Sequence, residues 1–357
     1  MRLLATTNRG LESVAAAEVE RLTGEAATVH HPGWIALDAP VEAIVTLNRR
    51  SRTLHRVMVE LVDAPVDGLD EVAALTDGVD FERYVESGQA FAVRSTRIGS
   101  HDFESPEVSS VVGEAVIDSF REATGHRLPV DLDDPDVAFE ATVRHDRFTL
   151  ALDTTGPVSL HRRPYRVCEH PAPVRPTLAA AMLDLVEFSP DESLADPLCG
   201  GGTIPIEAAL LARGRSSNAD RTDFAFQDLA FVPDDGLSPS TETDPTARII
   251  GGDRDPEYLD CARENVAAAG VDVGLYRGDA TVAVPDADVI VTDLPFNLRQ
   301  DHGDLRPLYR GFAAAVERVA PVRLAALTTR PDLLPLGDET ITFRDGRLDV
   351  AIVLATL

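Results

Sequence analysis

The sequence contains no lysine. All 33 of its basic residues are arginine and they stand against 60 acidic residues, which gives a formal net charge of −27. A surface this acidic ordinarily repels nucleic acid, and that is one interpretation of the charge. The other is adaptation to molar salt, where the Debye length at ~1 M is only ~3 Å and repulsion hardly extends beyond contact. We favour salt adaptation, a halophilic protein, so the charge does not exclude an RNA partner.

Other absences narrow the class of protein further. The cysteines at 168, 199 and 261 are far apart and form no CxxC pair, which argues against a disulfide framework and against a zinc site. No apolar run approaches the ~18–20 residues of a membrane span, and the N-terminal apolar stretch is too short for a signal peptide. We therefore expect a cytoplasmic protein with no metal and no membrane partner.

The chain divides into two α/β parts joined by a linker. Residues 1–155 alternate strands with helices, and residues 156–175 are a proline- and arginine-rich linker in which the prolines disfavour helix. Residues 176–357 show a regular β-α-β alternation, which predicts a Rossmann-like, mostly parallel, doubly wound sheet. Residues 213–246 are an acidic, proline-containing insertion within it, interpreted as a long loop. The expected strands of the first part are 3–6, 34–37, 54–62 and 91–93, with helices at 11–22, 69–75 and 106–123 and a hairpin around 145–146.

The first candidate site is a glycine-rich loop that follows a short strand. It reads Asp196-Pro197-Leu198-Cys199-Gly200-Gly201-Gly202-Thr203 and leads into a helix. Glycines let the backbone approach a ligand closely, although a plain strand-to-helix turn would have the same composition. The GxGxxG spacing of a dinucleotide site and the GK[ST] of a phosphate loop are both absent. An acid directly before the glycines suits a ligand with a cationic group, such as the amino-acid end of S-adenosylmethionine.

Two further acids end the next two strands. Asp253 lies in Gly251-Gly252-Asp253-Arg254-Asp255, where a carboxylate commonly binds both hydroxyls of a ribose. Asp279 lies in Gly278-Asp279-Ala280, where an adenine amino group could be held. Each alone could be a helix cap or a polar turn. Because the carboxyl ends of successive parallel strands meet at one edge of the sheet, the acids together predict a cofactor site there.

The fourth strand ends in Asp293-Leu294-Pro295-Phe296. Asp293 can accept a hydrogen bond from an exocyclic amine of a base and receive its proton, and Pro295 stiffens the loop. Phe296 offers a face on which a base can stack, worth ~1–3 kcal/mol in single-stranded recognition. A strand stop followed by a core phenylalanine is the alternative. We interpret the segment as a clamp for a base amine, which does not by itself name the base.

The motifs RPTLAAAM, DPLCGGGT, GGDRD and DLPFNLR occur in that order, together with SLHRRPYR and FAVRSTRIGSHDFESPEV. In this arrangement the chain resembles the THUMP-domain class I methyltransferases that act on RNA guanine N2, and most of all the archaeal tRNA enzymes for position 6. Leu294 stands where relatives often have proline, and GGGT replaces a common GSGT. The resemblance implies an N-terminal ferredoxin-like and THUMP region over 1–155 that holds the tRNA 3′ end and acceptor stem. It also implies that Arg175, Pro176 and Thr177 touch the methionine end of S-adenosylmethionine, and that the segment 293–296 is catalytic.

Arginines are the candidates for contact with RNA phosphates, because guanidinium binds phosphate in a bidentate manner. Salt bridges to the many acids are the alternative for each of them. The main candidates are Arg94, Arg97, Arg162, Arg163 and Arg166, with a second group at Arg49, Arg50 and Arg52.

The expected activity is methyl transfer from S-adenosylmethionine to N2 of a tRNA guanosine, by a monomer. The same chemistry on guanosine 10, on an rRNA guanine or on adenine N6 stays open, as does an RNA-binding protein with a vestigial methyltransferase domain. A thiouridine synthetase would need a phosphate-cradling loop that this chain lacks.

Overall fold

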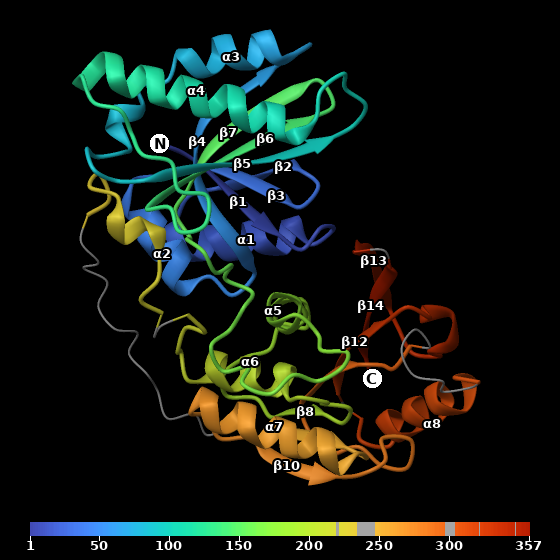
Figure 1. The fold of residues 1–357 in the computed structure, drawn as a ribbon. Coiled ribbons are helices and arrows are strands. Elements are labelled where there is room, and N and C mark those ends of the chain that lie inside the picture. Colours follow the sequence, from blue (N-terminus) through green and yellow to red (C-terminus); the bar gives the residue numbers. More distant parts are fainter. Residues whose placement is uncertain (219–220, 234–246, 297–303, 321, 347) are drawn as a thin grey trace.

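The computed structural model describes residues 1–218, 221–233, 247–296, 304–320, 322–346 and 348–357 (Figure 1). Two seven-stranded sheets form the centres of two domains, which the ribbon shows one above the other. Residues 297–299 of the DLPFNLR motif and the second half of the insertion lie outside the described residues.

The first sheet has the strand order β2-β3-β1-β4-β7-β6-β5. The long strand β4 (Leu54–Pro65) joins its two halves, since its first part pairs with β1 and its second part with β7. The N-terminal part over residues 1–155 is therefore built on one continuous sheet. Its other elements are β1 (Arg2–Thr7), α1 (Glu12–Thr23), β2 (Ala27–His31), β3 (Trp34–Asp38), α2 (Glu42–Arg50), α3 (Leu69–Asp77), η1 (Phe81–Arg83), β5 (Phe91–Ile98), α4 (Ser105–Thr124), β6 (Val137–Arg144) and β7 (Arg147–Asp153).

The second sheet has the order β10-β9-β8-β11-β12-β14-β13, in which the first five strands are parallel and the last two antiparallel. This is the mostly parallel, doubly wound sheet that the alternation predicts. The order reverses between β8 and β11, and ligands bind at such switch points, outside the carboxyl ends of the strands. The elements are α5 (Pro176–Leu185), β8 (Leu194–Asp196), α6 (Thr203–Ala212), η2 (Ala225–Asp228), β9 (Ile249–Asp253), α7 (Pro256–Ala269), β10 (Gly274–Arg277), β11 (Val289–Asp293), α8 (Arg306–Glu317), β12 (Arg323–Thr328), η3 (Pro331–Leu333), β13 (Glu339–Asp345) and β14 (Leu348–Thr356).

The described part of the insertion is not a simple loop. Its aromatic residues Phe224 and Phe226 are 2% exposed and belong to the hydrophobic core of the N-terminal domain. The amide of Phe226 donates to the carbonyl of Thr154 at 3.0 Å, and the guanidinium of Arg49 lies over both rings. The insertion therefore fastens the C-terminal domain to the N-terminal domain, which the low periodicity of its sequence did not indicate.

The structure contradicts the expectation that the chain has no disulfide. Cys168 of the linker and Cys261 of α7 form a disulfide across a sequence separation of 93 residues, and Cys199 is the free cysteine. Spacing alone did not indicate the pair, because the linker returns over α7 only in the folded protein. The bond ties residues 156–175 to the second domain, so this segment is not a free linker.

Cys168→Ser should lower the free energy of unfolding by about 2–4 kcal/mol relative to the oxidised protein, because a disulfide restricts the unfolded chain. Denaturant unfolding with and without a reducing agent measures this. The wild-type protein should lose stability on reduction and the variant should not respond. Equal unfolding of the wild-type protein in both conditions would contradict a stabilising disulfide.

Candidate active site

A cavity of about 790 Å³ opens at the carboxyl ends of the parallel strands. It brings together residues of the RPTLAAAM, DPLCGGGT, GGDRD and DLPFNLR motifs and of Gly278-Asp279-Ala280, although these lie far apart in the sequence. Of the expected site residues, those that line it are Arg175, Asp196, Cys199, Gly200, Gly201, Thr203, Asp253, Arg254, Asp279, Ala280, Asp293, Leu294, Pro295 and Phe296. Pro176, Thr177, Pro197 and Gly202 are not among its lining residues.

The glycine loop is held in a narrow space between β9 and α7. Gly202 begins α6 with a φ of 82°, a left-handed conformation that suits glycine, and a Cβ there would come within 3.3 Å of Ala262. The amide of Cys199 donates to the carbonyl of Gly252 at 2.7 Å. The loop is thus a fixed turn whose glycine backbone faces the cavity without side chains.

Two carboxylates flank this loop. Asp196 is 1% exposed, and its Oδ1 accepts hydrogen bonds from Thr292 Oγ1 at 2.7 Å and from the amide of Leu198 at 3.1 Å. Burial raises the pKa of Asp196 to about 7 despite these bonds. Asp253 accepts from the amide of Gly200 at 3.1 Å. Both acids therefore stabilise the loop as well as line the cavity.

The third acid, Asp279, also stabilises the turn in which it lies. Its Oδ1 accepts from the amide and the hydroxyl of Thr281 at 2.9 and 2.7 Å. The side-chain hydrogen bond from Thr281, reinforced by the backbone one, holds the pKa of Asp279 below its ordinary value. Oδ1 of Asp279 therefore stabilises a polar turn, and the same residue also lines the cavity.

The Asp293–Phe296 segment leaves β11 at the centre of the cavity. Leu294 is fully buried and its amide donates to the carbonyl of Leu327 at 2.9 Å, so it anchors the segment in the core. The carbonyl of Pro295 accepts from the hydroxyl of Tyr309 at 3.3 Å. Asp293 Oδ1 is buried and has no hydrogen-bond partner among the described residues. Burial, together with the nearby carboxylates of Asp196 and Asp345, raises the pKa of Asp293 to about 8.

Two side chains of α7 that the sequence did not single out contact the segment 156–175. The side chain of Asn265 on α7 accepts from the amides of Val167 and Cys168 at 3.0 and 2.9 Å, and it donates to the carbonyl of Gly201 at 2.9 Å. The rings of His170 and Tyr258 pack edge to face on the cavity wall, with 4.2 Å between their centroids. Asn265 therefore couples this segment to the glycine loop. In the sequence it is simply a polar residue on a helix.

Thr177 faces the N-terminal domain. It is fully buried, and its hydroxyl lies 3.2 Å from Asn8 Nδ2 and 3.0 Å from His55 Nε2. The expected role in cofactor contact is therefore not what its side chain does in this structure. Its neighbour Arg175 does line the cavity, and its guanidinium forms an ion pair with Asp345 at 3.0 Å.

The candidate RNA-binding arginines fall into two groups. Arg163 is 3% exposed and forms an ion pair with Glu207 at 3.0 Å in which neither side chain is exposed. Arg163 is therefore a buried structural residue, which corrects its assignment to RNA contact. Arg52 is similar, since it donates to the carbonyls of Leu210 and Arg215 in the joint between the domains.

The other arginines retain some exposure. Arg94 and Arg97 are partly exposed and pair with Glu140 at 4.0 Å and with Glu104 at 2.8 Å. Arg162 is exposed and Arg166 is partly exposed.

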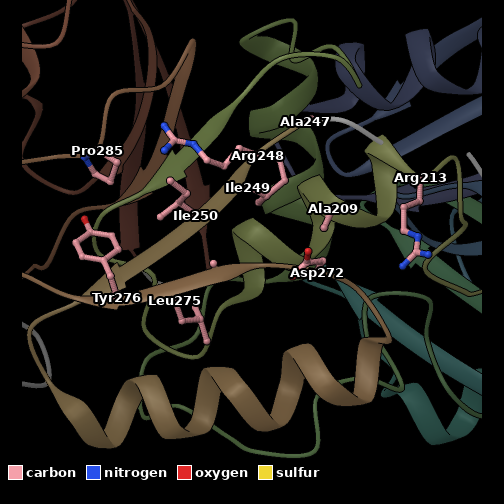
Figure 2. A pocket seen from close by; sticks show the side chains of 11 residues that line it. Ala209, Arg213, Ala247, Arg248, Ile249, Ile250, Asp272, Leu275, Tyr276 and Pro285 are labelled. Carbon is pink, nitrogen blue, oxygen red and sulfur yellow. The ribbon is translucent and has the colours of Figure 1, made fainter. Parts of the chain in front are cut away.

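A second cavity of about 590 Å³ lies over β9 and β10 (Figure 2). Figure 2 shows Arg213, Arg248 and Tyr276 around it, and none of the expected site residues lines it. The first cavity is therefore the candidate active site.

Within the described parts of the chain, no helix is long and apolar enough to cross a membrane. In the same parts, no group of three or more His, Cys, Asp or Glu side chains is arranged to hold a metal ion.

The domain matches agree with this architecture. Residues 2–58 match the RlmL ferredoxin-like domain, residues 67–153 the THUMP domain, and residues 163–336 the RMKL-like methyltransferase domain. TrmN from Thermus thermophilus is 28% identical and superposes with a TM-score of 0.76 over 100% of this chain and 99% of its own. A methyltransferase crystallised with S-adenosylhomocysteine has the same fold, with a TM-score of 0.88 over 99% of this chain and 97% of its own, at 24% identity. These matches define a THUMP-domain methyltransferase.

More specific matches come from archaea. The tRNA (guanine(6)-N2)-methyltransferase of Archaeoglobus fulgidus is 38% identical over 89% of this chain and 80% of its own length. The enzyme of the same name from Methanocaldococcus jannaschii is 32% identical over 89% of this chain and 87% of its own length. The chain belongs to the family of THUMP-domain methyltransferases that contains these two proteins.

Proposed function

We propose that the protein transfers a methyl group from S-adenosylmethionine to the exocyclic N2 amine of a guanosine in tRNA, at position 6 of the acceptor stem. The observation that carries this proposal is the buried Oδ1 of Asp293, which has no hydrogen-bond partner in the described parts of the chain and lies in the cavity that Asp196 and Asp253 also line. An acceptor in that position suits an amine that brings its own hydrogens. The names of the two archaeal relatives support guanine N2 of tRNA and position 6.

The cavity fits the proposed cofactor. Gly200 and Gly201 leave room for close approach, and the carboxylates of Asp196 and Asp253 suit an ammonium group and ribose hydroxyls. Asp279, Ala280 and Arg175 line the same cavity. We assign the first two to the adenine and Arg175 to the carboxylate of the cofactor. S-adenosylmethionine supplies a methyl group that its sulfonium already activates.

The chain then supplies orientation and a proton acceptor. The lone pair of a guanine N2 amine is delocalised into the ring, so the nitrogen is a poor nucleophile. In its ionised form, the Asp293 carboxylate accepts a hydrogen bond from N2, and a backbone carbonyl of the loop accepts a second, which favours a pyramidal nitrogen. The same carboxylate then takes up the proton that leaves the nitrogen. Phe296 provides a stacking face for a base that has been flipped out of its helix. Buried Leu294 fixes the loop, so positioning supplies much of the rate.

We propose further that the protein acts as a monomer in the cytoplasm and at molar salt. The N-terminal domain and the site belong to one chain, which provides RNA binding without a second subunit. The absence of lysine and the net charge of −27 support adaptation to high salt. Arg94, Arg97, Arg162 and Arg166 are the proposed RNA contacts, since each retains exposed or partly exposed surface.

The test uses unmodified tRNA and labelled S-adenosylmethionine with the full-length protein, in parallel at ~0.1 M and ~3 M KCl, where the Debye length falls from ~10 Å to a few ångströms or less. Nucleosides are then digested and analysed by mass spectrometry. We expect N2-methylguanosine, mapped to acceptor-stem fragments, and more of it at the higher salt. Methyladenosine would overturn the base assignment. A folded protein that binds the cofactor but does not methylate tRNA would overturn the function.

A further inference from the structure

We propose that Asp345 determines the choice of base, by accepting the N1–H of the guanine whose N2 amine Asp293 accepts. This inference rests on the proposed function and adds to it a residue that distinguishes guanine from other bases with an amine. None of the sequence motifs includes Asp345, which lies at the end of β13 in the turn to β14.

The fold brings this turn to the active site. Asp345, Leu348 and Val350 of the β13–β14 hairpin line the same cavity as Asp293 and Phe296. In sequence, Asp345 and Asp293 are far apart, and in the sheet β13 is an edge strand that β12 and β14 separate from the central strand β11. The carboxylate of Asp345 is close enough to contribute to the raised pKa of Asp293. Two carboxylates from separate elements therefore face one space.

Asp345 is positioned but still accessible. The guanidinium of Arg175 contacts its Oδ1 at 3.0 Å, and the side chain is 31% exposed. One carboxylate oxygen is thus oriented from the segment that enters α5, and a carboxylate has further lone pairs with which to accept. The partly exposed side chain avoids the full cost of burying a charge.

The chemistry of the guanine edge fits two acceptors. N1–H and N2–H lie side by side on that edge, and both are donors. Adenine and 2-aminopurine carry an amine but present a lone pair at N1, which would face the carboxylate of Asp345 unfavourably. A site built to accept a hydrogen bond discriminates strongly against an analogue that cannot donate one. Asp293 alone would accept any amine, so the discrimination must come from a second group.

The experiment compares two RNAs that differ at one base. The tRNA is assembled with guanosine or with 2-aminopurine at the position that the labelling experiment maps, because 2-aminopurine keeps the N2 amine and loses N1–H together with O6. Any effect of the missing O6 is common to the two proteins compared. The ratio of kcat/KM for the two RNAs is measured for the wild-type protein and for Asp345→Asn. Effects of 2-aminopurine on the RNA itself cancel when the ratios of two proteins are compared.

We expect the wild-type protein to prefer guanosine by at least about tenfold, in line with the cost of an unmet buried hydrogen bond. Asp345→Asn should bring the ratio close to one, because an amide can both accept from N1–H and donate to a lone pair at N1. Asp345→Ala, a second variant, should also lose the preference. Asp349→Asn changes the same charge on the same hairpin at an exposed position and should keep the wild-type ratio.

The variant Arg175→Met tests the alternative that Asp345 only holds Arg175 in place and does not contact the base. That alternative predicts that Arg175→Met removes the base preference as fully as Asp345→Asn does. We expect instead a higher KM for S-adenosylmethionine with most of the preference retained. If both proteins methylate guanosine in tRNA and the wild-type and Asp345→Asn ratios agree, the inference is overturned while the proposed function stands. No methylation of tRNA guanosine by the wild-type protein would overturn the proposed function and the inference with it.

Discussion

Asp293→Ala should reduce methyl transfer by about 100-fold or more, since a positioned proton acceptor contributes roughly 10²–10⁴ in rate. Cofactor binding should persist, because Asp196, Asp253 and the glycine loop are unchanged. Initial rates with saturating tRNA give the first quantity, and calorimetric titration with S-adenosylmethionine gives the second. Asp332→Ala, an exposed aspartate that pairs with Arg330 on the surface, is the control and should behave as the wild type. A wild-type rate for Asp293→Ala would exclude the mechanism.

The raised pKa of Asp293 makes the same variant informative about pH. With a pKa of about 8 in the folded protein and an ordinary value near 4 in the unfolded chain, the folded state binds an extra proton between these values. Stability from this group is therefore present below about pH 4 and is lost as pH rises towards 8. Asp293→Ala removes that loss, so its stability relative to the wild type should increase with pH over this window. Thermal unfolding at several pH values measures the difference, and a constant difference would contradict the raised pKa.

The fold could be predicted to a large extent because it follows from local patterns. Alternating apolar runs and glycine-terminated helical stretches predicted the β-α-β order, and the doubly wound sheet confirms that prediction. Helix α2 and strand β2 were missed, since they have only nine and five residues. A segment this short spans too few turns or alternations for its apolar pattern to be distinguished from that of a loop. The sharing of β4 by both halves of the first sheet was also missed. It depends on which strands pair, and strand pairing is decided by contacts between distant residues.

In the candidate site, too, features that follow from local sequence patterns were predicted, and features that depend on contacts between distant residues were not. The acids and glycines were found because each ends a strand, and the sheet topology brings strand ends to one edge. Asp345 and Asn265 were not found, because their roles arise from elements that meet only in the folded protein. The Cys168–Cys261 pair is of the same kind. Arg163 was misjudged because an arginine-rich stretch looks the same whether its side chains face solvent or a buried glutamate.

Replacing Arg163 should destabilise the protein by about 3–5 kcal/mol, the usual cost of removing one partner of a buried ion pair. In Arg163→Met, the carboxylate of Glu207 would stay buried, and its remaining donors among the residues that the structure describes would be the hydroxyls of Tyr165 and Ser217, at 2.9 and 2.8 Å. The carbonyls of Leu160 and Arg52, which accept from the Arg163 guanidinium, would also lose a donor. Denaturant unfolding measures the loss. Arg263→Met, which removes an exposed partner of Asp260, should cost only about 0–1 kcal/mol.

The double variant Arg163→Met, Glu207→Leu distinguishes the ion pair from packing alone. Removing both charges leaves no unpaired ion, so the double variant should be more stable than Arg163→Met by itself. An RNA-contact role for Arg163 predicts the opposite pattern, in which stability hardly changes and tRNA affinity falls with a shallower salt dependence. Because Arg163 also bonds to Arg52, whose side chain reaches α6 and its following turn, the ion pair holds the two domains together. A loosened joint should then lower the rate on tRNA more than it weakens cofactor binding, since the function we propose requires the RNA, and not the cofactor, to contact both domains at once.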